Sequence, residues 1–103
     1  MKVILNTGNH IQGDESLAGH VDGVVEKALG RFSHQITRVE VHVSDANGSK
    51  SGSGDKHCTM EARLEGRQPV TADNDADSVR EAVAGAARKL QRVLDSSLGR
   101  LSG

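Results

Sequence analysis

The chain has 103 residues and a mass of 10.9 kDa, enough for one compact domain and too little for two full cores. Its single aromatic residue, Phe32, nearly excludes recognition of single-stranded bases by aromatic stacking. Thirteen basic and fourteen acidic residues give a formal charge of −1, so any contact with nucleic acid requires an uneven charge distribution. One cysteine excludes an internal disulfide, and no apolar run is long enough for a signal peptide or membrane span. These features predict a soluble, cytoplasmic protein.

The first half of the chain predicts a strand, a helix and a second strand. Residues 2–7 form a short apolar and β-branched run that ends at a turn signal. From Leu17 to Phe32, apolar residues recur at three- and four-residue spacing, which is typical of an amphipathic helix. Residues 36–44 then alternate, with valines on one face and polar side chains on the other, as expected for a half-buried strand.

The second half predicts two further strands and a second helix. Residues 47–55 are rich in Gly and Ser and predict a loop. The alternation then resumes over 57–64, and a tight turn leads into a short strand at 68–72. Pro69 suits an edge strand, because it has no N–H to give to a neighbour. A helix is expected over about 75–94, where alanines and apolar residues follow helical spacing.

The predicted order is β-α-β-β-β-α. Alternating strands imply a sheet with one covered and one wet face, and two amphipathic helices would cover that first face. The sequence therefore predicts an α+β fold: a two-layer sandwich with a four-stranded sheet and both helices on one side. We expect a single domain over residues 1–95, followed by a polar tail over 96–103 that frays.

The acidic cluster 73–77 carries carboxylates at alternate positions, as a calcium-binding loop does at its start. Ser78 stands where that loop needs glycine, and Ala84 where it needs a bidentate glutamate. We therefore interpret the cluster as a helix N-terminus, with Asp75 or Ser78 as the cap and Glu81 completing a capping box.

Histidines and the cysteine invite a metal hypothesis, although their spacing matches no zinc motif. If residues 47–55 close a hairpin, His42 and His57 come near each other on the wet face, but two imidazoles alone make a poor zinc site. Cys58 is expected to be a core thiol. The chain has neither a G-x-S-x-G element nor the ending of a phosphate-binding loop. We predict no catalytic residue, no metal site and no cofactor; a small metal-binding or hydrolytic protein around the two histidines is kept as an alternative.

The basic residues form the most informative pattern. On the predicted second helix, four of them avoid the apolar stripe: Arg80, Arg88, Lys89 and Arg92. Arg88 and Arg92 are one turn apart and share a face. The first helix ends with Lys27 and Arg31, whereas acidic residues concentrate at the helix starts and at 73–77. This distribution predicts a basic end and an acidic end in a nearly neutral molecule; ordinary solvated helix faces are the alternative interpretation.

Motifs along nearly the whole chain resemble the ribosome hibernation-promoting and ribosome-associated inhibitor proteins. They are Thr7-Gly8-Asn9-x-Ile11, Leu17, Lys27-Ala28-Leu29-x-x-Phe32, Ile36-x-x-Val39-x-Val41, Glu61-Ala62, Glu65-Gly66, Asp77 and Lys89-Leu90-x-Arg92-x-Leu94. No one of them is diagnostic, but their order and spacing together make the match. That family has the same β-α-β-β-β-α sandwich, which is similar to double-stranded-RNA-binding domains.

The resemblance implies a partner and a role. Such proteins bind the small ribosomal subunit in the channel used by mRNA and tRNA, and they silence idle ribosomes in stationary phase or stress without catalysis. The resemblance carries Lys27, Lys89 and Arg92 over as rRNA-binding residues, and the charge pattern adds Arg31 and Arg88. We expect these side chains to contact rRNA phosphates and to recognise shape. We expect no membrane and no small-molecule substrate as partners, and we expect the protein to be a monomer or a weak dimer.

The chain resembles a short-form member of the family, and its glycine-bearing first helix and near-absence of aromatics mark it as divergent. Two further features depart from the family pattern. Asp95-Ser96-Ser97 follows the second helix where many relatives continue with lysines, and only Arg100 remains. The chain also stops where long members continue into a dimerisation domain. Fewer phosphate contacts predict weaker binding with a shallower salt dependence. A non-enzymatic protein-interaction module of the same fold, acting on a regulatory protein, is the alternative function.

Overall fold

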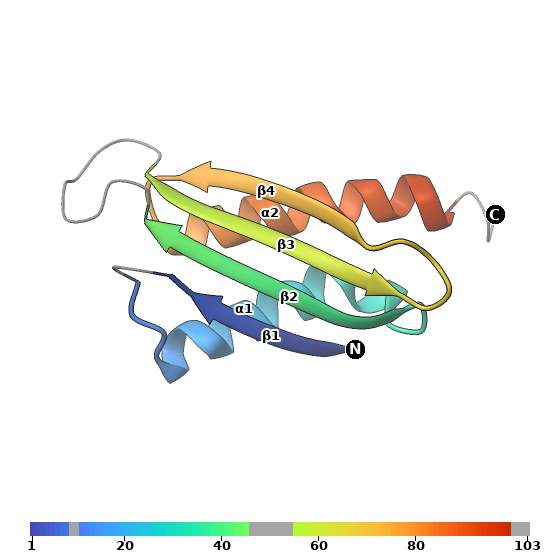
Figure 1. Cartoon of the computed structure of the whole chain (residues 1–103), viewed down its shortest axis with the longest axis horizontal. Coiled ribbons are helices and arrows are strands. Elements are labelled where there is room, and N and C mark those ends of the chain that lie inside the picture. Colours follow the sequence, from blue (N-terminus) through green and yellow to red (C-terminus); the bar gives the residue numbers. More distant parts are fainter. Residues whose placement is uncertain (9–10, 46–54, 100–103) are drawn as a thin grey trace.

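A computed structural model describes residues 1–8, 11–45 and 55–99. Its order of elements confirms the predicted β-α-β-β-β-α sequence (Figure 1). The elements are β1 (Lys2–Thr7), α1 (Glu15–Leu29), a 3₁₀ turn (Gly30–Phe32), β2 (Ile36–Asp45), β3 (Lys56–Leu64), β4 (Val70–Ala76), α2 (Val79–Leu94) and a π-helical turn (Asp95–Gly99).

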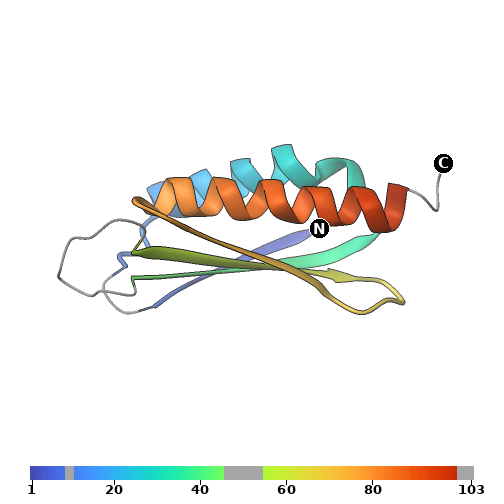
Figure 2. The ribbon, with the colours of Figure 1, turned by 90° about the horizontal axis from the view of Figure 1, so that it is seen from above.

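The four strands form one sheet in the order β1-β2-β3-β4, with β1 parallel to β2 and the other neighbours antiparallel. Both helices lie on one face of the sheet, which confirms the predicted two-layer sandwich (Figure 2). Each helix follows a strand that finishes at the same end of the molecule, and the two helices therefore run side by side in one direction. We call this end, where both helices begin, the entry end, and the opposite one the exit end.

The core lies between the helices and the covered face of the sheet. Strand β2 supplies Val39, Val41 and Val43, as its alternation predicted, and β3 supplies Cys58, Met60, Ala62 and Leu64. The helices contribute Leu17, Val21, Val25, Leu29, Ala82, Val83, Ala86, Ala87, Leu90 and Leu94. Helical spacing predicts Val93 in the apolar stripe of the second helix, but its side chain faces outward and is 38% exposed. Each fully buried Val or Leu contributes about 1.5–3 kcal/mol, so an aliphatic core of this kind can hold the layers together.

Both helix starts are capped by side chains. Asp14 Oδ1 accepts a hydrogen bond from the backbone N–H of Leu17 at 2.9 Å. Ser78 Oγ accepts one from Glu81 N–H at 3.1 Å and donates to Glu81 Oε1 at 2.9 Å. The predicted capping role of Ser78 is thus confirmed over the alternative, Asp75.

Strand β4 is longer than predicted and begins later, at Val70. It runs to Ala76, which pairs with Lys56 of β3, so most of the acidic cluster is strand and α2 begins at Val79, later than the predicted residue 75. The cause is tertiary pairing, which overrides the low strand propensity of Asp and Asn. Gly85 of α2 lies against Asn74 so closely that a Cβ would collide with the amide. Helix and strand are thereby brought into close contact.

Residues 96–99 also differ from the prediction. These residues of the predicted tail belong to a π-helical turn that ends at Gly99, and Leu98 is only 6% exposed. Burial of this one leucine fixes the turn against the core. Residues 100–103 of that predicted tail lie outside the described residues. The predicted loop over 47–55 lies outside the described residues except for its last one, Asp55, which is buried at 3% exposure and paired with Lys56.

Candidate nucleic-acid interface

A groove of about 470 Å³ runs between the two helices on the side away from the sheet. Small side chains form its floor, since Val24 and Ala28 of α1 face Ala84 and Ala87 of α2. Three longer polar side chains line it: Lys27, Arg88 and Gln91. Two of the predicted rRNA-binding residues, from helices far apart in the sequence, therefore share one groove.

Arg92 extends this cationic surface by one helical turn beyond Arg88, because residues four apart share a helix face. Lys27, Arg88 and Arg92 are all exposed. Within the described ranges, none of their side chains forms an ion pair or a hydrogen bond to another side chain. We call these three residues the groove cations. Their charges are available to an external anion.

The other two predicted residues are engaged within the protein. Lys89 Nζ donates to the backbone carbonyl of Asp73 on β4 at 3.0 Å, so this side chain leans toward the sheet edge and away from the groove. Arg31 forms an ion pair with Asp95, and its guanidinium lies 4.7 Å from the centre of the Phe32 ring. The five predicted residues thus divide into three that are free and two that already have partners.

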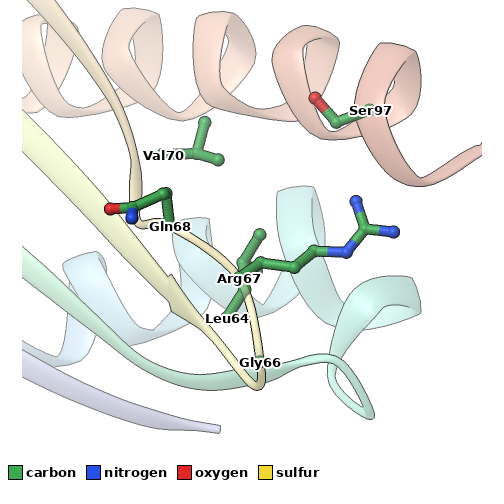
Figure 3. A pocket seen from close by; sticks show the side chains of 6 residues that line it. All are labelled: Leu64, Gly66, Arg67, Gln68, Val70 and Ser97. Atoms are coloured by element: carbon green, nitrogen blue, oxygen red, sulfur yellow. The ribbon is translucent and has the colours of Figure 1, made fainter.

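A second cavity, of about 720 Å³, opens at the exit end between the β3–β4 hairpin and the π-helical turn (Figure 3). It is lined by Leu64, Gly66, Arg67, Gln68, Val70 and Ser97. Gly66 has φ of +72°, the left-handed conformation that makes this tight turn possible. The Arg67 side chain extends from the hairpin toward the π-helical turn and adds a cation to the exit end.

Sequence reasoning missed Gln91 and the placement of Arg67. Gln91 could have been found, because it lies seven residues after Ala84 and four after Ala87 and therefore shares their helix face. The placement of Arg67 depends on where the hairpin meets the end of α2, and residue spacing carries no signal of it.

The open face of the sheet carries cations of a different kind. Glu40 Oε2 accepts from Arg38 Nε at 3.0 Å and from Arg63 Nε at 3.2 Å, and Arg63 also reaches Glu61 at 3.3 Å. Desolvation raises the pKa of Glu40, but the hydrogen bonds and charges of Arg63 and Arg38 outweigh it and hold the pKa below its ordinary value. The arginines of this face are therefore neutralised in place.

The two strand histidines lie on this open face, as predicted. In the β2–β3 register, His42 pairs with Thr59 and Ser44 pairs with His57, so the two histidines lie two residue pairs apart on neighbouring strands. His57 contacts Asp75 Oδ1 at 2.5 Å and Thr59 Oγ1 at 3.1 Å, whereas His42 lies 3.9 Å from Glu40. Among the residues that the structure describes, no three His, Cys, Asp or Glu side chains gather as metal ligands would. Burial raises the pKa of the Cys58 thiol to about 12, as expected for a core cysteine.

The balance of acidic and basic residues changes along the long axis of the molecule. The entry end carries Asp14, Glu15, Asp45, Asp55, Asp75, Asp77 and Glu81. The exit half carries seven of the cations, Lys27, Arg31, Arg63, Arg67, Arg88, Lys89 and Arg92, together with the acidic residues Glu26, Glu65 and Asp95. Two entry-end cations have partners: Lys56 lies 3.4 Å from Asp45 and 3.0 Å from Asp55, and Arg80 donates to Ser16. The balance of charge therefore agrees with the predicted basic and acidic ends, although neither end carries charges of one sign alone.

The chain is thus a small α+β protein whose helix layer carries exposed cations beside a groove. The profile of the family described as Sigma 54 modulation protein / S30EA ribosomal protein matches residues 4–102, and the chain belongs to this family. The relationship predicted from the sequence motifs is thereby confirmed.

Two solved structures share the fold at low sequence identity. The N-terminal domain of Protein Y from Thermus thermophilus superposes with a TM-score of 0.75 at 14% identity, covering 94% of this chain and 99% of that one. A ribosomal subunit interface protein from Coxiella burnetii gives a TM-score of 0.71 at 18% identity, covering 96% and 99%. A comparison with curated protein sequences found no significant match. In the described part of the chain, no helix has the length and hydrophobicity needed to span a membrane.

Proposed function

We propose that this protein is a ribosome-associated translation inhibitor that binds the small ribosomal subunit and blocks the mRNA and tRNA channel in stressed or stationary cells. Family membership supports the ribosome as the partner. The observation that carries the proposal is the interhelical groove, where Lys27 and Arg88 stand beside Arg92 without internal partners. Cations that are free within the protein are what a phosphate backbone requires.

The proposed mechanism is steric and electrostatic. The groove cations contact rRNA phosphates, and because these contacts carry no base information, the protein recognises the shape of the rRNA surface. The acidic entry end is repelled by rRNA and therefore orients the long axis of the molecule, with the exit half toward the subunit. Occupation of the channel suffices for inhibition; the protein needs no catalytic residue and no cofactor and acts in the cytoplasm.

Contributions to binding are expected to be graded. The groove cations contribute most, since they give up no internal partner on binding. Lys89 must leave the Asp73 carbonyl and Arg31 must leave Asp95 before either side chain can contact a phosphate, and each exchange lowers the net gain. Arg67 adds a further contact at the exit end.

Co-sedimentation with purified small subunits at rising salt tests the proposal. The test variant is K27Q/R88Q/R92Q, and the matched control K2Q/R38Q/R63Q removes the same number of cations from the open face of the sheet. We expect the test variant to bind at least about tenfold more weakly at low salt and to lose about 2–3 from the slope of log K against log salt. The control should bind within about twofold of wild type.

Absence of co-sedimentation of the wild type at low salt would overturn the proposal. Equal loss in both variants would also contradict it, because it would mean that overall charge governs binding. Circular dichroism on both variants establishes that they are folded. If wild-type protein enriches one regulatory protein from a lysate without rRNA, the alternative of a protein-interaction module replaces this proposal.

A further inference from the structure

The two edge strands of the sheet differ in how well they are protected. At the β4 edge, Pro69 precedes the strand, Asp73 and Asp75 project from it, and Lys89 Nζ donates to the Asp73 backbone carbonyl at 3.0 Å. Proline, charged side chains and an occupied backbone acceptor all discourage pairing with another strand. The β4 edge is therefore closed to an added strand.

The β1 edge has few of these devices. Its sequence, KVILNT, contains no proline and one charged residue, Lys2 at its start, and the apolar Val3, Ile4 and Leu5 are only partly buried. In the described chain β1 pairs with β2 alone, so the backbone groups on its other side are open to a new strand. At the Thr7 end of the strand, Gly13 lies against the threonine side chain and covers that end.

An acidic helix flank overhangs this edge. In α1, Val21 and Val25 face the sheet, and Val24 and Ala28 face α2. At 3.6 residues per turn, Asp22 and Glu26 fall on the flank turned away from α2 and share one face. Because α2 packs over β3 and β4, this flank lies toward β1. Asp22 and Glu26 are exposed, and within the described residues neither forms an ion pair.

We propose that the β1 edge binds an extended cationic peptide segment of another protein, which adds to the sheet as a fifth strand. Backbone hydrogen bonds to β1 supply the pairing. Side chains of the added strand alternate between the two faces. Lysine or arginine at the positions facing the helices reaches Asp22 and Glu26, and uncharged residues at the other positions lie beside Ile4 on the open face.

The same charges exclude a second copy of this chain at this edge. Antiparallel pairing of two β1 strands would keep all helices on one side and bring the two α1 flanks together. Asp22 and Glu26 of one copy would then face their equivalents in the other, and like charges in such proximity are unfavourable. The complementary partner is a basic segment, whereas an acidic one is repelled.

Fluorescence anisotropy with a labelled acetyl-KVKVKVK-amide peptide tests this inference on the free protein, without ribosomes. The test variant is D22K/E26K, and D73K/D75K on the β4 edge is the matched control with the same change in charge. We expect saturable binding by wild type, no binding of the acetyl-EVEVEVE-amide counterpart, about tenfold weaker binding by the test variant, and less than about twofold change in the control.

Amide chemical-shift changes locate the bound peptide. The inference predicts that the largest shifts fall on Val3 to Asn6. No binding by wild type, equal weakening of both variants, or shifts centred on β4 would overturn it. Since the assay contains no ribosome, its outcome is independent of co-sedimentation and separates this inference from the proposed function.

Discussion

The helix groove and the open face of the sheet both carry cations, but only one of them presents free charge. On the sheet, Arg38 and Arg63 share the carboxylate of Glu40. In the groove, Lys27 and Arg88 have no carboxylate partner in the described chain. A protein with a net charge of −1 can thus form a cationic surface through the placement of its acidic residues, without an excess of basic ones.

The local sequence of α2 explains the free charge. Arg88 is preceded one turn earlier by Ala84 and followed one turn later by Arg92, so no acidic residue lies at a pairing distance along the helix on this face. Beyond Arg92 the sequence does offer a carboxylate at pairing distance, Asp95, which lies three residues later. It is occupied by Arg31 from the first helix, which keeps it from neutralising Arg92.

The largest expected effect comes from giving the groove a carboxylate of its own. In Ala84→Glu, a glutamate one turn before Arg88 imitates the part that Glu40 plays on the sheet. We expect binding to small subunits to weaken about tenfold, because one cation is neutralised and rRNA meets a new negative charge. Ala84→Gln, which has the same shape without the charge, is the control in co-sedimentation and should remain near wild type.

A smaller effect is expected at the Arg31–Asp95 pair. Asp95→Asn releases Arg31 and removes a negative charge, and should strengthen binding by about two- to fivefold. Arg31→Gln instead frees Asp95 to pair with Arg92 and should weaken binding by a similar factor. The double variant should bind more tightly than Arg31→Gln alone. A double-mutant cycle measures this coupling, and strictly additive effects would refute it.

Releasing the two arginines of the open face from their carboxylate partner should leave ribosome binding unchanged. Glu40→Gln frees Arg38 and Arg63, but these lie on the open face of the sheet, opposite the helix layer that carries the groove cations. The change should appear in acid stability instead. The folded-state pKa of Glu40 lies below the ordinary value of 4.5, so its stabilisation is present above that pH and is lost as the pH falls through the folded pKa. Thermal unfolding midpoints of wild type and Glu40→Gln should converge on acidification; a constant difference would argue against the pairing.

The smallest effect is expected from a thiol reagent on Cys58, in the core between the helices and the sheet. Cys58 is fully buried, and its pKa is raised to about 12, so the thiol stays protonated at neutral pH. A thiol reagent such as dithionitrobenzoate should leave the folded protein unmodified and react only after unfolding in denaturant. Rapid labelling of folded protein would show that the sheet and helix layers separate readily.

Local patterns were sufficient to predict most of the fold. Period-two alternation identified the inward faces of β2 and β3, and helical spacing identified both apolar stripes. The errors arose where tertiary contacts outweighed local preference. Asp73 and Asp75 are poor strand formers, yet pairing with β3 holds them in β4.

The candidate site was less predictable than the fold. Charge and family motifs identified five basic residues without showing which of them are free. The partners of Arg31 and Lys89, which are Asp95 and the Asp73 carbonyl, lie 64 and 16 residues away in the sequence. Residue spacing does not predict pairings over such distances. It also does not predict that Lys27 and Arg88 line the same groove, because this depends on how the two helices pack side by side.

Lysine labelling of the protein with and without small subunits shows whether the helix groove is the surface that binds rRNA. Lys27 lines the groove and Lys2 lies on the open face of the sheet, so their acylation rates report which side meets the ribosome. Bound subunits should slow the labelling of Lys27 by about tenfold or more, as expected for a buried phosphate contact. Unchanged labelling of Lys27 together with protection of Lys2 would contradict it.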